Sequence, residues 1–177
     1  MNKGKTHNQL IALAERGDVS AKIALAEGLV ENGIEDVDEA TKIVMWIQEL
    51  AKTGNPDAQY YTATMYRLSK DHMSAFFFYG KAAMQNHPLS LYWAARYYFS
   101  GQAAGIDKDL NTAFCLAEKA FKLGEKKYSP QLLACFYLSG NVVNQDLKEA
   151  YKLMKMALSN GNDDVIDDIK QLENFLS

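Results

Sequence analysis

Residues 147–161 read LKEAYKLMKMALSNG, and this stretch decides the fold. Its small and apolar residues follow the spacing Ala150-x-x-Leu153-x-x-x-Ala157-Leu158-x-x-Gly161. Steps of three, four and one residues place these side chains on one face of an α-helix. The glycine at the end is the residue that a helix terminus in the left-handed conformation favours. The stretch therefore predicts an amphipathic helix that packs against a neighbour and ends close to residue 160.

The same pattern recurs along the chain. Copies begin at Ala75 and Ala113, and the same offsets recover Ile43, Trp46, Leu50, Ala51 and Gly54. A fifth, weaker copy ends at Leu13, Ala14 and Gly17. The copies end at Gly17, Gly54, Asn86, Gly124 and Gly161. Successive ends therefore lie 37, 32, 38 and 37 residues apart. A nearly constant period of this size predicts an array of stacked structural repeats.

Each of the later copies is preceded by another helical pattern, with small or apolar residues at offsets 0, +4, +5 and +8. Counted from offset 0, these patterns begin at Ala21, Ala58, Ser90 and Ser129. We call them the first helices of the repeats, and the copies that follow them the second helices. All three prolines, Pro56, Pro88 and Pro130, fall where first helices open, and there a missing N–H costs nothing.

Aspartates mark the starts of three second helices. Asp71, Asp109 and Asp146 each stand four residues before the anchor alanine of the helix, where they can cap it. Asp146 and Glu149 have the spacing of a capping box. The first repeat is longer by about one helical turn, around residues 39–42. The second repeat lacks a connecting loop between its helices.

These patterns resemble those of the Sel-1-like repeat family, a relative of the tetratricopeptide repeat. The resemblance is carried by Ala75-x-x-Phe78-x-x-x-Ala82-Ala83 and by Tyr137-x-x-Gly140-x-x-Val143-x-x-Asp146-x-x-x-Ala150. It extends over residues 6–161, with Phe78, Leu116 and Leu153 in place of the family's common tryptophan. The resemblance implies an all-α fold, a right-handed α-solenoid whose first helices line the concave side.

We expect a single array over residues 1–177. Its predicted parts are a cap helix at 6–16, repeats at about 17–53, 54–85, 86–123 and 124–160, and a C-terminal cap helix at 162–176. The last helix has an apolar stripe formed by Val165, Ile166, Ile169, Leu172, Phe175 and Leu176. Four aspartates in its first turns suit the positive end of the helix dipole.

Offsets +2, +6 and +9 of the first helices point away from the core, and the resemblance places them in the concave groove. The residues there are Ile23, Glu27, Val30, Tyr60, Thr64, Arg67, Tyr92, Arg96, Phe99, Gln131, Cys135 and Leu138. Tyrosine and arginine are enriched at the energetic centres of protein interfaces. We therefore predict that Tyr60, Arg67, Tyr92, Arg96 and Phe99 bind a partner protein. The alternative is that these aromatic rings pack against the next repeat.

Composition excludes several classes of function. The net charge of −3 disfavours nucleic acid as the main partner, and no apolar run reaches the length of a membrane span. The two cysteines fit no metal or redox spacing. With no recognisable leader, they indicate a cytoplasmic protein.

Catalysis has little support. His7, His72 and His87 lie on separate elements, and none has a partner at the spacing of a helical zinc site. No phosphate loop or nucleophile motif occurs, so we expect no enzyme activity, cofactor or metal. Glu27 is the acidic residue that the predicted groove offers to a hydrolase.

The leading hypothesis is a protein–protein interaction module that binds a partner in the groove. A narrower alternative is a bacterial immunity protein that neutralises a cognate toxin. A hydrolase acting on a cell-wall fragment is the competing class. The exposed aromatic residues leave a homodimer open as well.

Overall fold

The computed structural model describes residues 4–101 and 105–176, and over these residues the chain forms helices and no strands. This confirms the predicted all-α fold class. Contacts divide the chain into two compact units, Met1–Gln85 and Asn86–Ser177. The division falls between the second and third predicted repeats.

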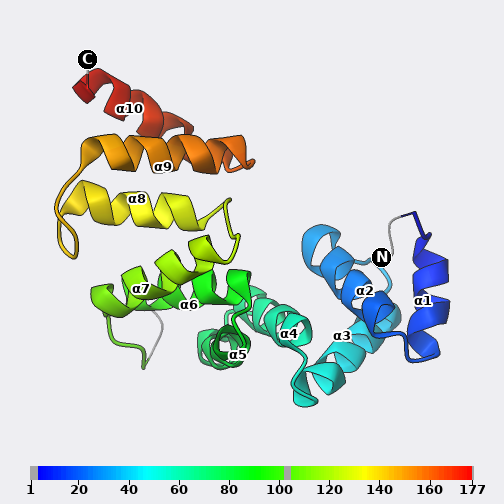
Figure 1. Ribbon diagram of the computed structural model, residues 1–177. Coiled ribbons are helices and arrows are strands. Elements are labelled where there is room, and N and C mark those ends of the chain that lie inside the picture. The colour runs from blue at the N-terminus through cyan, green and yellow to red at the C-terminus, as the bar shows by residue number, and fades with distance from the viewer. Residues whose placement is uncertain (1–3, 102–104, 177) are drawn as a thin grey trace. The chain divides into compact units, whose positions relative to one another are not determined.

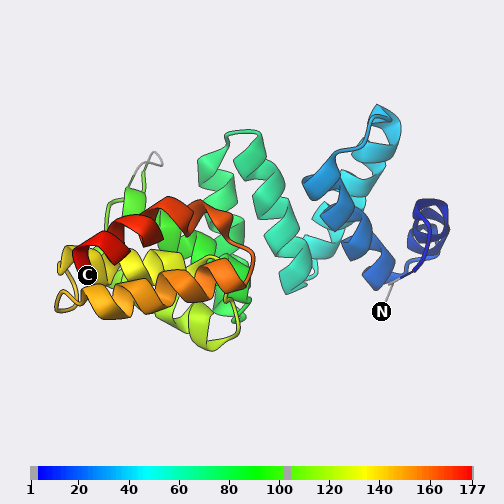
Figure 2. The same ribbon diagram turned by 90° about the horizontal axis from the view of Figure 1, so that it is seen from above.

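Over its described residues, 4–85, the first unit contains five helices. They are α1 (His7–Glu15), α2 (Val19–Asn32), α3 (Val37–Lys52), α4 (Pro56–Leu68) and α5 (His72–Met84). Sequence neighbours pack together, and α4 with α5 forms a helical hairpin (Figure 2). Its connection is residues 69–71, as short as predicted. The core consists of Ala14, Ala21, Leu25, Ala26, Ile43, Ile47, Ala51 and Ala58.

The second unit continues with helix pairs. It contains α6 (Pro88–Ser100), α7 (Leu110–Lys122), α8 (Ser129–Ser139), α9 (Leu147–Ser159), the 3₁₀ turn η1 (Asp163–Val165) and α10 (Ile166–Leu176). Helix α6 packs on α7, and α9 packs on both α8 and α10 (Figure 1). Its core includes Leu91, Ala95, Ala113, Ala117, Ala120, Leu133, Phe136, Ala150, Leu153 and Ala157.

The predicted helix caps are present. Asp71, Asp109 and Asp146 accept backbone N–H groups of the first turns of α5, α7 and α9. Hydrogen bonds from Thr112, first from its hydroxyl and then from its backbone, hold the pKa of Asp109 below its usual range. Glu149 does not complete a capping box; its carboxylate lies 3.2 Å from Lys152 Nζ instead.

Helix ends follow the predicted pattern too. Backbone φ is positive at Gly17, Gly54, Asn86, Gly124 and Gly161, where the second helices and α1 end. Asn86 is the non-glycine among them, and asparagine tolerates this conformation better than most residues. The prolines open their helices as predicted, at the first position of α4 and α6 and the second of α8.

A buried alanine recurs in the first helices at offset +5. Ala26, Ala63, Ala95 and Ala134 are all fully buried there. In α10 the matching residue is Lys170, which is exposed, while Val165, Ile169 and Leu172 are buried. Helix α10 therefore covers the last repeat with one apolar face. The predicted stripe is wrong for Ile166, Phe175 and Leu176, which are exposed.

Amide side chains connect the two ends of a repeat. In the first unit, Gln85 Nε2 donates to the Gly54 carbonyl and to Gln59 Oε1, both at 2.9 Å. In the second unit, Asn162 Nδ2 donates to the Lys127 carbonyl at 3.1 Å and to Gln131 Oε1 at 3.0 Å. Each amide lies after a second helix and holds the backbone that leads into the first helix of the same repeat.

Candidate interaction surface

Helices α6, α8 and α10 of the second unit bring the groove offsets of the third and fourth repeats together. Two charges from other helices act on the pKa of the Cys135 thiol on α8: Asp168 of α10 raises it and Arg96 of α6 lowers it. Burial is the largest effect on this thiol and raises its pKa. We define the α6/α8/α10 face by Arg96, Cys135, Leu138, Asp168 and Phe175.

Arg96 is held in place at this face. Its side chain is exposed, and its guanidinium Nη1 donates to the Tyr92 hydroxyl at 3.3 Å. The same guanidinium lies 5.9 Å from the centre of the Trp93 ring. Because a hydroxyl and a ring orient it, the guanidinium loses little further freedom when it binds a partner.

Tyr92 differs from the expectation. Its side chain is only 3% exposed, because its ring stacks on Tyr128 with centroids 5.4 Å apart. Burial is the main cause of the raised pKa of its hydroxyl. Tyr92 therefore packs against the start of the next repeat, which is the alternative that the sequence left open. Its link to the surface is its hydroxyl, which orients Arg96.

A cleft lined by both apolar and polar side chains forms part of the face. Phe99 is half-buried, and its ring meets Phe136 edge-on with centroids 5.4 Å apart. A cleft of about 330 Å³ lies beside the end of α8, lined by Leu138, Gln145, Leu147, Asp168, Gln171, Leu172 and Phe175. The Phe175 ring is 79% exposed.

In the first unit, the side chains at the groove offsets of α4 gather around the buried side chain of Tyr79. Tyr79 of α5 is fully buried, and its hydroxyl lies 3.0 Å from Thr64 Oγ1. Arg67 Nε donates to the same oxygen at 3.4 Å, and the Tyr60 ring lies 6.0 Å from the Tyr79 ring. Burial raises the pKa of Tyr79 well above its usual range. Tyr60 and Arg67 are both half-buried, so they combine this packing role with a remaining exposed edge.

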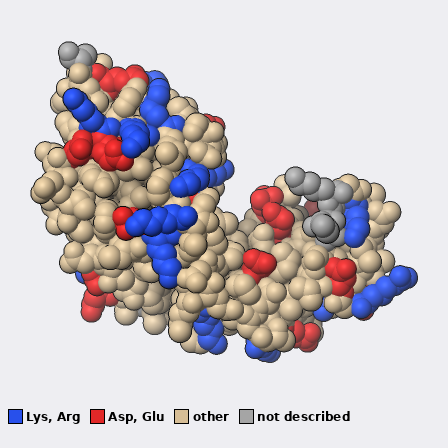
Figure 3. Space-filling model, in the orientation of Figure 1, with Lys and Arg blue, Asp and Glu red and all other residues tan. Residues whose placement is uncertain are grey.

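The neighbouring tyrosine, Tyr61, is influenced by acidic residues of α2. Burial is the main cause that raises the pKa of Tyr61, and Glu27 and Glu31 of α2 add to the effect. Tyr60 and Tyr61 meet edge-on, with centroids 5.0 Å apart. Figure 3 shows acidic and basic side chains scattered over the visible face, several of them side by side, with wide areas of other residues between them.

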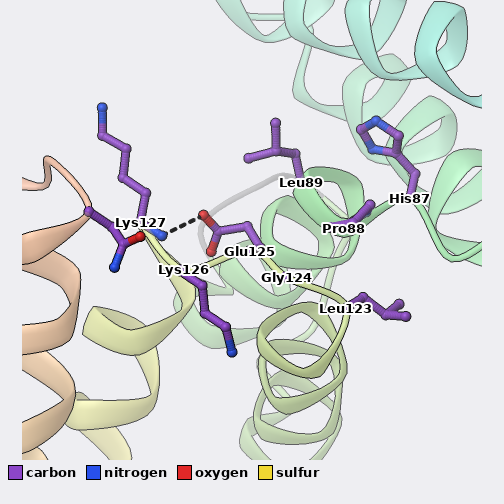
Figure 4. A pocket seen from close by; sticks show the side chains of 9 residues that line it. His87, Pro88, Leu89, Leu123, Gly124, Glu125, Lys126 and Lys127 are labelled. Atoms are coloured by element: carbon purple, nitrogen blue, oxygen red, sulfur yellow. Dashed lines mark hydrogen bonds between the residues drawn. The ribbon is translucent and has the colours of Figure 1, made fainter.

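A second cleft of the second unit, of about 440 Å³, is shown in Figure 4. It is lined by His87, Pro88, Leu89, Leu123, Gly124, Glu125, Lys126, Lys127 and Asn160. Glu125 has a structural partner there, because its carboxylate accepts the N–H groups of Lys127 and Tyr128 at 3.1 and 3.0 Å. Lys126 Nζ donates to the Phe121 carbonyl at 2.8 Å. Lys126 and Lys127 extend in different directions (Figure 4), so they do not surround one ligand.

The histidines have structural partners as well. His87 caps α6, since its Nδ1 accepts the Ser90 N–H at 3.2 Å. His7 Nε2 lies 2.6 Å from a carboxylate oxygen of Glu39. Within residues 4–101 and 105–176, no three His, Cys, Asp or Glu residues are placed to hold a metal ion. Among the described helices, none has the length and apolar character needed to cross a membrane.

Sequence comparison matches the Sel1 repeat to three parts of the chain, residues 56–87, 88–125 and 132–162. Together these parts cover more than half of the sequence. No curated protein matches it.

Solved structures of repeat proteins resemble this fold. A Sel1 repeat protein from Oxalobacter formigenes has a TM-score of 0.70 at 22% identity, over 88% of this chain and 64% of its own. The protein c5321 has a TM-score of 0.75 at 21% identity, over 97% of this chain and 37% of its own. It is described as a protective antigen of uropathogenic Escherichia coli strains that displays an SLR fold. Cysteine-rich protein B of Helicobacter pylori has a TM-score of 0.52 at 18% identity, over 75% of this chain and 97% of its own. The chain thus spans less than two thirds of the first two relatives.

Proposed function

Because the chain belongs to the Sel1 repeat family, we propose that it binds a partner protein through the α6/α8/α10 face. Sel1 repeat proteins generally mediate protein–protein interaction and act as scaffolds rather than as enzymes. The observation that carries the proposal is the exposed guanidinium of Arg96, oriented by Tyr92 and Trp93 on a face that also holds a cleft partly lined by leucine and phenylalanine side chains.

The face offers charges of both signs. Arg96 lies on α6 and Asp168 on α10, and besides burial both charges act on the pKa of the Cys135 thiol, which Asp168 raises and Arg96 lowers. A guanidinium has five N–H donors, and the Tyr92 hydroxyl accepts one of them. A carboxylate or backbone carbonyl of a partner segment can therefore bind Arg96 while a donor binds Asp168. This arrangement favours one direction of the partner segment over the reverse.

The cleft supplies apolar contact area. Its volume of about 330 Å³ accommodates one large apolar side chain, and Leu138 and Leu172 form part of its wall. Phe175 is 79% exposed, and binding would remove this ring from water. Burial of an aromatic ring is among the largest single contributions at protein interfaces.

We expect the Arg96→Ala/Phe175→Ala variant to bind the partner at least about tenfold more weakly than the wild type, since it loses both anchors. The measurement is affinity capture from a lysate of the source organism, followed by titration of the captured protein. Lys119→Ala, an exposed change on α7, is the matched control and should bind as the wild type does.

A folded double variant that binds the partner as tightly as the wild type would contradict the proposed surface. The same experiment separates the finer alternatives. A captured toxin whose activity the protein suppresses would support the immunity-protein hypothesis. Self-association lost only in the double variant would place a homodimer at this face.

A further inference from the structure

Helix α5 carries an exposed apolar stripe on the side opposite its buried residues. Met73 is 51% exposed, Phe77 54% and Met84 86%. At 100° per residue these three positions fall within about 40° of one another. Ala75, Tyr79 and Ala82 point to the other side of the helix and are fully buried. We call Met73, Phe77 and Met84 the α5 stripe.

The stripe belongs to this repeat alone among the second helices. Its members stand at offsets −2, +2 and +9 from the anchor residue of the helix. The matching residues are Thr41, Met45 and Lys52 in α3, Asn111, Cys115 and Lys122 in α7, and Lys148, Lys152 and Ser159 in α9. These sets are polar or basic except for Met45 and Cys115. Packing within the repeat therefore does not explain an apolar surface at these offsets of α5.

The shape of the stripe suits a helix as its partner. It runs straight along α5 for about 16 Å, from residue 73 to residue 84. A partner helix can lay its own apolar ridge along such a row, with the Phe77 ring at the centre of the contact. Methionine side chains adapt to the residues that they meet, and an exposed aromatic ring is a frequent energetic centre of an interface.

The charge at the stripe is positive. Lys81 Nζ lies 4.4 Å from the centre of the Phe77 ring, so its ammonium group stands beside the middle of the stripe. Residues 72–106 contain no aspartate or glutamate, although the whole chain has 22 acidic residues. The acidic residue next to this range is Asp71, which caps the start of α5, ten residues before Lys81. A carboxylate on the partner can thus approach Lys81 without repulsion from acidic residues within α5.

We propose that the α5 stripe is a second docking surface, which binds an acidic amphipathic helix of another protein. The apolar face of that helix covers Met73, Phe77 and Met84, and one of its carboxylates pairs with Lys81. The proposal concerns the first unit and none of its residues lies on the α6/α8/α10 face, so the two binding surfaces can be tested separately.

The test uses three fluorescein-labelled synthetic helices of about 18 residues with the same leucine stripe and with Glu, Gln or Lys beside it. Fluorescence anisotropy measures their binding to the whole chain. We expect the Glu peptide to bind at least about tenfold tighter than the Lys peptide. Lys81→Glu should reverse that order, and Phe77→Asp should weaken all binding by about tenfold or more. Met45→Asp, at the same offset of α3 and 57% exposed, is the matched control and should change nothing.

Equal binding of the three peptides, or unchanged binding to Phe77→Asp, would overturn the proposal. Met84→Asp is the second variant, and its 86% exposure makes it harmless to folding; circular dichroism verifies that both variants are folded. Analytical ultracentrifugation tests whether a second copy of this chain, rather than a helix of another protein, covers the stripe. A wild-type dimer that becomes a monomer in Phe77→Asp would show that a second copy covers the stripe, which also overturns the proposal.

Discussion

The Tyr79→Ala variant is expected to lose about 4 kcal/mol of the free energy of unfolding of the first unit, because it removes a fully buried aromatic side chain. The ring packs beside Tyr60, and the hydroxyl contacts Thr64 and Arg67. Truncation leaves a cavity under α4 and removes the acceptor of the Arg67 Nε–H. Urea unfolding followed by circular dichroism measures the loss.

Tyr79→Phe separates the ring from the hydroxyl. Thr64 Oγ1 keeps its hydrogen bond to the Tyr60 carbonyl at 3.0 Å, so the lost hydroxyl should cost only about 1 kcal/mol. Phe77→Ala, two residues earlier on the exposed side of α5, is the control and should stay within about 0.5 kcal/mol of the wild type. A cost for Tyr79→Ala no greater than that of Phe77→Ala would show that the first unit does not depend on this ring.

Glu125→Ala is expected to cost about 3 kcal/mol of the free energy of unfolding of the second unit, because it removes the acceptor for the N–H groups of the two residues before α8 and of the first residue of α8. Glu125 is 6% exposed, and its carboxylate accepts the N–H groups of Lys127, Tyr128 and Ser129. Tyr128, which directly precedes α8, supplies no side-chain cap. The buried Ser129 N–H and the partly buried N–H groups of Lys127 and Tyr128 would therefore lose a charged acceptor near the positive end of the helix dipole.

The amide variant Glu125→Gln tests how much of this depends on charge. It keeps one oxygen acceptor and should lose about half as much free energy as Glu125→Ala. Asp109→Ala removes an exposed cap in the same unit and should cost clearly less than Glu125→Ala. If the two alanine variants unfolded at the same urea concentration, the buried position of Glu125 would add nothing to its capping role.

Local rules in the sequence predicted most of the fold. Helix starts at prolines and aspartates, helix ends at glycine or asparagine, and alanines at fixed offsets all depend on residues within one or two turns. The cap by Glu125 was missed, although the sequence holds a signal for it. Asp18, Asn55 and His87 directly precede α2, α4 and α6, whereas the matching position before α8 is a tyrosine. A missing cap residue indicates that the acceptor comes from elsewhere.

The candidate surface was less predictable, because its residues contact other elements. An angle around a helix places Tyr92 away from its own repeat, but Tyr128 of the following connection covers it. Likewise, offset +4 of the second helices is a tyrosine at position 79 but Ile47, Ala117 and Met154 in the other repeats. The spacing alone does not show that the Tyr79 hydroxyl contacts Thr64 and Arg67 of α4. Periodicity gives the direction of a side chain and not the neighbour that it meets.

The division into two units has an optical consequence, since the chain contains two tryptophans and each unit holds one. Trp46 packs against the core of the first unit, with the Lys42 ammonium 5.0 Å from its ring centre. Trp93 lies beside Tyr92 in the second unit, with ring centroids 5.3 Å apart. Replacing either indole by phenylalanine leaves emission from one unit only. Fluorescence can therefore follow the unfolding of each core separately, without an attached dye.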